Sequence, residues 1–232
     1  MGSTVIGGVT YPEMLDQPLV PSDLRRVAEE VMRSAMPRFA SAAERTAAYA
    51  TLGITPTRGA TCWLDSALRC EVYVGANGWA ALPGTILKRG RRSTSSSGTT
   101  TEVGVLRLDD LPIIGGQAYN IWTSALAPDT TVANDVMTAK IRYTTDGSTP
   151  TTASPILSAS KSQVRQPDAS NGESVSIACT YQPTNNETLS LLLTVARTAG
   201  TGTVLLFADG DFGIELVVQA GGFDTGDEGT EI

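Results

Sequence analysis

Residues 188–196 read TLSLLLTVA, and this run decides which class of fold the second half of the chain can adopt. It is rich in aliphatic and β-branched residues, the composition of a buried strand. Within it, residues 189–193 (LSLLL) place apolar side chains on both faces of an extended chain. Such a strand suits a crowded core, and equally a position between its own core and a neighbouring subunit.

Similar strand-like runs surround this one. Residues 174–179 alternate, with Val175, Ile177 and Cys179 on one face and small or polar residues on the other. Gly, Pro, Asn or Asp bound nearly all the runs, which lie at residues 103–108, 117–123, 136–144, 174–181, 203–208 and 212–219. Because no helical pattern separates them, the sequence predicts a β-sandwich, jelly-roll-like, over residues 102–220. Residues 221–232 are Gly-rich and acidic, the composition of a tail.

The segment before this sandwich has a different composition. Residues 91–101 (RRSTSSSGTTT) are rich in side chains that pack poorly, so we expect residues 84–101 to form a Ser/Thr/Gly linker. Four cations gather at its start, Lys88, Arg89, Arg91 and Arg92, and suit a solvated hinge or a contact with a neighbouring subunit.

Residues 37–83 carry the signals of a helix followed by a small β-meander. Ser41 and Glu44 have the spacing of a capping box, and Gly53 follows the Ala-rich run as a helix stop. Three short strands are expected near residues 60–64, 69–74 and 79–82. Cys62 and Cys70 fall on the first two of these strands, where they either form a disulfide or pack as small apolar residues.

Residues 1–36 are predicted to form an extended arm followed by an amphipathic helix. Leu24, Val27 and Val31 recur at helical spacing within residues 22–36. A helix of about four turns with one apolar stripe is marginal alone, so this stripe packs on its own domain or on copies of itself. Three-fold packing of these residues around an axis would make a homotrimer.

Charge and composition exclude several kinds of partner. Residues 1–92 hold 11 Lys and Arg against 8 Asp and Glu, whereas residues 93–232 hold 6 against 16, so the second part is acidic and unsuited to nucleic acid. No apolar run approaches the roughly 20 residues that cross a bilayer, and the start lacks the pattern of a secretory signal. Three cysteines, an odd number, favour a reducing compartment.

Catalytic chemistry finds little support in the sequence. The chain has no histidine, which removes Ser-His-Asp, Cys-His and His-ligated zinc sites. No phosphate-binding loop or calcium-loop spacing occurs. We therefore expect no catalytic residues, no metal site, no cofactor and no enzyme activity.

A family resemblance rests on residues 37–82. The order PRFASAAER (37–45), CWL (62–64), LRCEVY (68–73) and Gly78-Trp79 resembles a module common in phage tail and fibre proteins, with Val74 where that module has aspartate. Residues 102–151 are similar to the β-rich C-terminal part of minor tail proteins of phages that infect actinobacteria.

The resemblance implies a mainly β virion structural protein, a minor tail, tail-tip or fibre component that assembles with other virion proteins and contacts the host surface. It implies a location in the virion, and in the host cytoplasm during assembly. Two alternatives stay open, a capsid decoration or head-fibre protein and a carbohydrate-binding module. In the latter, a host cell-surface glycan would stack on Tyr119, Trp122 or Tyr143.

Overall fold

The computed structural model describes the 232-residue chain except for residues 1–2, 7–8, 13–25, 30–35, 170–172 and 224–232. The chain divides into two compact units, residues 1–82 and 83–232. No helix in the described ranges is long and apolar enough to cross a membrane.

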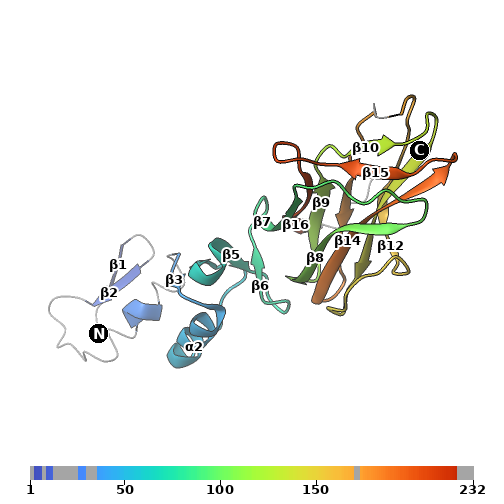
Figure 1. The fold of residues 1–232 in the computed structure, drawn as a ribbon. Helices are drawn as coiled ribbons and strands as arrows, with labels where there is room; N and C mark the ends of the chain where they lie inside the picture. The colour runs from blue at the N-terminus through green and yellow to red at the C-terminus, as the bar shows by residue number, and fades with distance from the viewer. Residues whose placement is uncertain (1–2, 7–8, 13–25, 30–35, 170–172, 224–232) are drawn as a thin grey trace, which may run out of the picture. The chain divides into compact units, whose positions relative to one another are not determined.

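The first unit contains a small mixed sheet covered by one helix (Figure 1). The sheet order is β3-β4-β5-β6, with β3 parallel to β4 and the other pairs antiparallel. A separate hairpin pairs β1 with β2, and residues 26–29 are helical. The elements are β1 (Ser3–Ile6), β2 (Val9–Pro12), β3 (Arg38–Phe39), α2 (Ala42–Leu52), β4 (Thr61–Leu64), the 3-10 helix η1 (Asp65–Ala67), β5 (Arg69–Tyr73) and β6 (Trp79–Ala81).

The predicted caps fix both ends of α2. The Ser41 hydroxyl accepts a hydrogen bond from the Glu44 backbone N–H at 3.2 Å, and the Glu44 carboxylate accepts one from the Ala40 backbone N–H at 2.6 Å. Gly53 ends the helix in the left-handed region at φ 65°, where a side chain would be strained. The helix then packs Tyr49 against Phe39 and Leu64 of the sheet.

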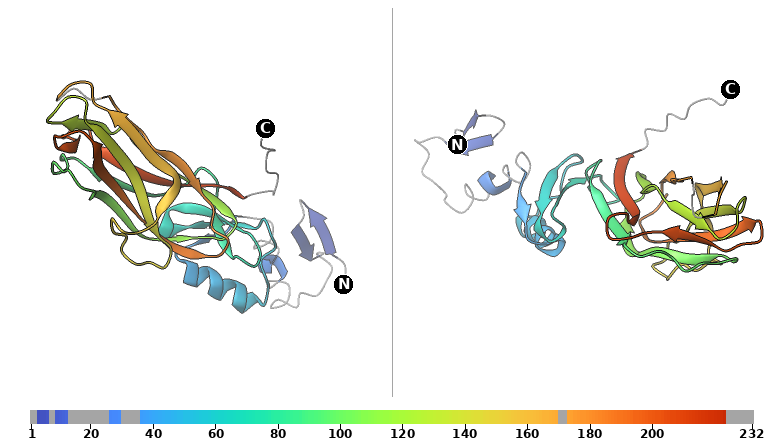
Figure 2. Two further views of the ribbon diagram at one scale, coloured as in Figure 1. Left: turned by 90° about the vertical axis from the view of Figure 1, so that its right-hand side faces the viewer. Right: turned by 45° about the horizontal axis from the view of Figure 1, so that its top comes forward.

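The second unit is a sandwich of two four-stranded antiparallel sheets, ordered β12-β11-β14-β8 and β13-β9-β16-β7, which face each other across one core (Figures 1 and 2). A third, two-stranded sheet pairs β10 with β15. The strands are β7 (Ile86–Arg92), β8 (Val103–Ile113), β9 (Gln117–Thr123), β10 (Ala127–Thr130), β11 (Val136–Thr144), β12 (Ile156–Arg165), β13 (Ala178–Tyr181), β14 (Glu187–Ala199), β15 (Val204–Phe207) and β16 (Ile214–Phe223).

The pairing of the eight sandwich strands is nested. β7 pairs with β16, β8 with β14, β9 with β13, and β11 with β12. The first strand thus pairs with the last, the second with the seventh, and so on inward, as in one long hairpin rolled into two sheets. This is the topology of a jelly roll, as the sequence predicts.

Residues 84–101 do not form the predicted linker. Ile86–Arg92 are β7, an edge strand, and the Ser95 and Ser96 side chains bond the backbone of Ala208 and Leu206. The charged residues of this segment suggest a solvated linker, but in the structure charged side chains of β7 donate hydrogen bonds to backbone carbonyls of β8. Lys88 donates to the Asp109 carbonyl, and Arg92 donates to the Val105 carbonyl at 3.1 Å.

A buried carboxylate ties two loops together at one end of the sandwich. Asp135 is fully buried and accepts hydrogen bonds from the Thr130 hydroxyl at 2.7 Å and the Thr201 backbone N–H at 2.9 Å. Burial acts to raise its pKa, but these hydrogen bonds hold the pKa of Asp135 below its usual value. Gly200 is required beside it, because a Cβ there would lie 1.8 Å from the Asp135 Oδ1 atom.

The domain division yields a test with two fragments. Residues 83–223 contain every strand of the sandwich and should fold alone, with cooperative thermal unfolding followed by near-UV circular dichroism. Residues 102–223 lack β7 and should lose cooperative unfolding, because one side of β16 is left unpaired. Equal stability of the two fragments would contradict the role given to β7, and an unfolded 83–223 fragment would contradict the division into units.

Candidate functional site

The predicted helix stripe falls mostly outside the described residues. Leu24 and Val31 lie in the ranges that the structure does not describe. Val27 belongs to the helical residues 26–29 and is half-buried. The proposed packing of these three side chains around an axis therefore stays a prediction.

The three aromatic residues predicted to contact glycan are not brought together. Tyr119 points into the core and is 1% exposed, and its hydroxyl donates to Gln117 Oε1 at 3.0 Å and accepts from the Ile114 backbone N–H at 2.6 Å. A buried ring cannot stack on a sugar, so the prediction for Tyr119 is wrong. The physical reason is strand parity, since Tyr119 shares the inward face of β9 with Ile121.

Tyr143 is half-buried and packs against the core between the two sheets. Its ring packs against Tyr181 with centroids 5.6 Å apart, and both rings contact the core. The Tyr181 hydroxyl donates to Glu187 at 2.8 Å. Burial and then the Glu187 carboxylate raise the pKa of Tyr181, so its hydroxyl stays protonated. This pair joins β11 of one sheet to β13 of the other.

Trp122 alone of the three lies on the outer face of its sheet. It is half-buried and alternates with the exposed Asn120 along β9. A shallow depression of about 270 Å³ beside it is lined by Asn120, Ile121, Trp122, Ala178, Cys179 and Thr180. The sequence missed the strand partners Ala178 and Thr180, which only the register of β13 on β9 brings next to Trp122.

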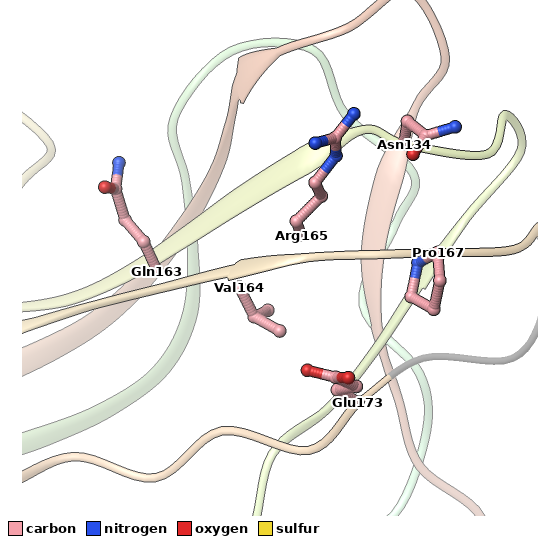
Figure 3. A pocket seen from close by; sticks show the side chains of 6 residues that line it. All are labelled: Asn134, Gln163, Val164, Arg165, Pro167 and Glu173. Atoms are coloured by element: carbon pink, nitrogen blue, oxygen red, sulfur yellow. The ribbon is translucent and has the colours of Figure 1, made fainter.

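Two further depressions lack converging chemistry. One, of about 410 Å³, lies at the end of β12, where Gln163 and Arg165 project to one side of the strand and Val164 to the other (Figure 3). The other, of about 460 Å³, includes Asp146 and Glu187. Asp146 accepts from the Ser148 backbone N–H and hydroxyl, which makes it part of a turn. Among the described residues, no group of three His, Cys, Asp or Glu side chains is placed to hold a metal ion.

The cysteines are reduced, and their places explain why. Cys62 is buried opposite Glu71, whereas Cys70 lies opposite Trp63, so the two thiols are on opposite faces of the β4–β5 pair. Burial raises the pKa of Cys62, and it raises the pKa of Cys179 to about 11. Both thiols are therefore protonated and poor nucleophiles at neutral pH.

A buried ion pair forms the centre of the first unit. The Arg45 guanidinium from α2 bonds the Glu71 carboxylate from β5, and both side chains are less than a tenth exposed. Arg69 adds a second cation at 2.6 Å from Glu71. The Arg45 Cζ atom lies 4.4 Å from the centroid of the Trp79 ring, a cation–π contact. One carboxylate thus joins helix and sheet, which is a structural role.

Removing the Glu71 charge tests this role. Glu71→Gln leaves the Arg45 charge buried without its counter-ion and should destabilise the first unit by roughly 3–5 kcal/mol. Hydrogen–deuterium exchange of peptides from residues 37–82 in the full chain measures the effect. The matched control is Asp65→Asn, which breaks the exposed pair with Arg38 and should change exchange little. Similar effects of the two substitutions would contradict the assignment.

A second ion-pair group covers the outer face of β14. Glu102 accepts from Lys140 at 2.6 Å, from Arg142 at 2.7 Å and from the Thr194 hydroxyl at 2.7 Å. Hydrogen bonds from Arg142 first, and then from Lys140 and Thr194, lower the pKa of Glu102 to about 2 against the opposing effect of burial. The group holds the start of β8 against β11 and β14.

This low pKa predicts a pH dependence of stability. Because the folded pKa lies below the ordinary value of 4.5, the stabilisation is complete above about pH 5 and is lost as the pH falls toward 2. Glu102→Gln should therefore lower the free energy of unfolding by about 3 kcal/mol at pH 7, and the difference from wild type should shrink toward pH 2. Urea unfolding at a series of pH values measures it. The control Asp168→Asn, an exposed carboxylate of the same unit, should follow wild type, and a pH-independent difference for Glu102→Gln would contradict the assignment.

Comparisons with known proteins add the following. The model of the chitobiase/beta-hexosaminidase C-terminal domain matches residues 123–167, about a fifth of the chain, from the end of β9 to just past β12. A search of the curated proteins found no match.

Solved structures give loose likenesses. A structure of the infectious bursal disease virus Gx strain aligns with 68% of this chain and 43% of the viral chain, at 11% identity and a TM-score of 0.33. The VP2 subviral particle of infectious bursal disease virus aligns with 63% of this chain and 40% of the viral chain, at 11% identity and a TM-score of 0.32. A structure titled "CBM4 structure and function" aligns with 66% and 71% at 13% identity and TM-score 0.23. The chain spans less than half the length of the two viral proteins. Superpositions this loose do not assign a function.

Proposed function

We propose that the chain is a structural protein of a bacteriophage virion, a minor tail, tail-tip or fibre component that serves assembly and host-surface attachment. The observation that carries the proposal is the resemblance of residues 37–82 to a module of phage tail and fibre proteins, on a segment that folds within a unit of its own. The jelly roll of the second unit is compatible with this proposal, because viral capsid and lectin domains use that architecture, but a fold by itself does not define function.

The proposal contains no catalytic step. A chain without histidine lacks the commonest general base. The carboxylates in ion pairs, at Glu71 and Glu102, have structural partners in the described part of the chain. We further propose that the protein is made in the host cytoplasm and ends in the virion, in contact with other virion proteins.

A carbohydrate-binding role is the second candidate, and the family-model match over residues 123–167 favours it, since that domain belongs to sugar-processing enzymes by its printed name. The two roles are compatible in a protein that attaches a particle to a cell. A capsid decoration or head-fibre protein differs from the first proposal in its place on the particle.

The oligomer that we propose is a homotrimer, held by the helix of residues 22–36 through Leu24, Val27 and Val31. One side of that helix is apolar in sequence, and closed symmetry allows the same surface to serve as its own partner. Burial of each of these side chains is worth about 1.5–3 kcal/mol before the entropy cost is subtracted.

Cryo-electron microscopy of the intact particle tests location and symmetry together. We expect density for the jelly roll on the tail or its tip, in copies that are multiples of three. Density on the capsid would favour the decoration or head-fibre alternative. Absence of the chain from purified particles, judged by mass spectrometry, would overturn the virion proposal, and a single or two-fold copy at the site would overturn the trimer.

A further inference from the structure

One sheet of the sandwich presents an outer surface built around Trp122. Strand parity places Asn120 and Trp122 outward on β9, and the register sets Thr180 and Ala178 beside them on β13. On the other side, β16 places Gln219 opposite Asn120 and Val217 opposite Trp122. These six residues, Asn120, Trp122, Ala178, Thr180, Val217 and Gln219, are called the Trp122 face below.

The centre of the Trp122 face is apolar and open on one side. Val217 is only 4% exposed although it lies on the outer side of the sheet, so larger side chains cover it, and Trp122 and Arg89 are its neighbours across the strands. On the opposite side of Trp122, Ala178 is exposed and too short to cover the indole ring. The adjoining depression of about 270 Å³ is lined by both Trp122 and Ala178.

The surrounding polar groups have hydrogen-bonding capacity left over. Thr180 bonds Asn120 Oδ1 at 3.3 Å, and the Gln219 amide nitrogen donates to the Gly84 carbonyl at 2.8 Å. Within the described part of the chain, the Trp122 indole N–H, the Asn120 amide nitrogen and the Gln219 amide oxygen have no protein partner. The face therefore offers two donors and one acceptor around an aromatic ring.

The Trp122 face carries no charged group of its own. Next to the Trp122 face, Arg89 of β7 donates to the Glu215 carboxylate of β16. The Glu215 Oε1 atom also lies 3.9 Å from the Arg91 Nε atom. An anionic ligand would find no free cation among the six residues, and a purely apolar protein surface would leave their amide and hydroxyl groups without partners. An uncharged ligand with both an apolar face and hydroxyl groups fits both conditions.

We propose that the Trp122 face binds an uncharged pyranose unit of a polysaccharide. The C–H face of such a ring stacks on Trp122, and its hydroxyl groups exchange hydrogen bonds with Asn120, Thr180 and Gln219. This names the ligand class for the attachment role proposed above, and it rests on that role only for the source of the glycan, a host surface.

Native affinity electrophoresis of the full chain tests the proposal. The probes are three neutral polysaccharides, a β-glucan, a mannan and an arabinogalactan, with heparin as a charged comparison. We expect retardation by at least one neutral probe, a loss of about tenfold in affinity for Trp122→Ala, and partial retention for Trp122→Phe. Asn120→Ala should weaken binding with unchanged thermal unfolding. Phe212→Ala removes another exposed aromatic side chain and serves as the matched control, which should bind as wild type.

Three outcomes would overturn the proposal. These are no retardation by any neutral probe, equal retardation of wild type and Trp122→Ala, and dissociation of an oligomer by Trp122→Ala in light scattering, which would make this face a contact between copies. Because purified protein is used, failure here leaves the location of the chain in the particle unaffected, and the two proposals fail separately.

Discussion

The pairing of β7 with β16 is the constraint on which the sandwich depends. It joins residues more than a hundred positions apart and encloses the other three nested ladders. Without it, β16 would pair only with β9, and the seam to β8 would lose Lys88 and Arg92, which reach carbonyls on that strand. A ladder between residues so far apart in the chain carries a large loop-closure entropy cost, which slows folding.

Much of this fold is predictable from local signals. The strands at residues 117–123 and 136–144 have the predicted bounds, and the caps of α2 are the predicted Ser41, Glu44 and Gly53. β7, β10 and β12 are missed, because none carries an apolar alternation. β7 is basic, β10 contains Pro128, and β12 is rich in serine and includes Ala159 at φ 55°. Whether an edge strand or a short strand forms depends on pairing with the neighbouring strands more than on the residues of the strand itself.

In the candidate site, strand parity determines which side chains face outward, and pairing register determines which residues of neighbouring strands lie beside them. Tyr119 and Trp122 are three positions apart on one strand, so they face opposite sides, and the burial of Ile121 fixes which side is inward. Parity alone could have separated the two aromatic residues. Among the polar groups around Trp122, Asn120 lies two positions away on β9. Thr180 and Gln219 come from β13 and β16, more than fifty residues further along the chain, and no local pattern identifies them. Pairing register supplies that part of the site.

Contacts within the sandwich weaken the argument that residues 189–193 form a subunit contact. They strengthen the argument that the sandwich binds a ligand on its surface. Residues 189–193 suit a strand between subunits by sequence, yet they are buried within one chain, with Glu102, Lys140 and Arg142 grouped beside Thr194 on the outer face. At one edge of the sandwich, Lys88 and Arg92 of β7 donate hydrogen bonds to carbonyls of β8 in the other sheet. At the opposite edge, β12 lies beside β13. The six residues of the Trp122 face carry one open aromatic ring and no charge, and they suit a small, repeated, uncharged unit, because such a ligand requires no rearrangement of the strands that support it.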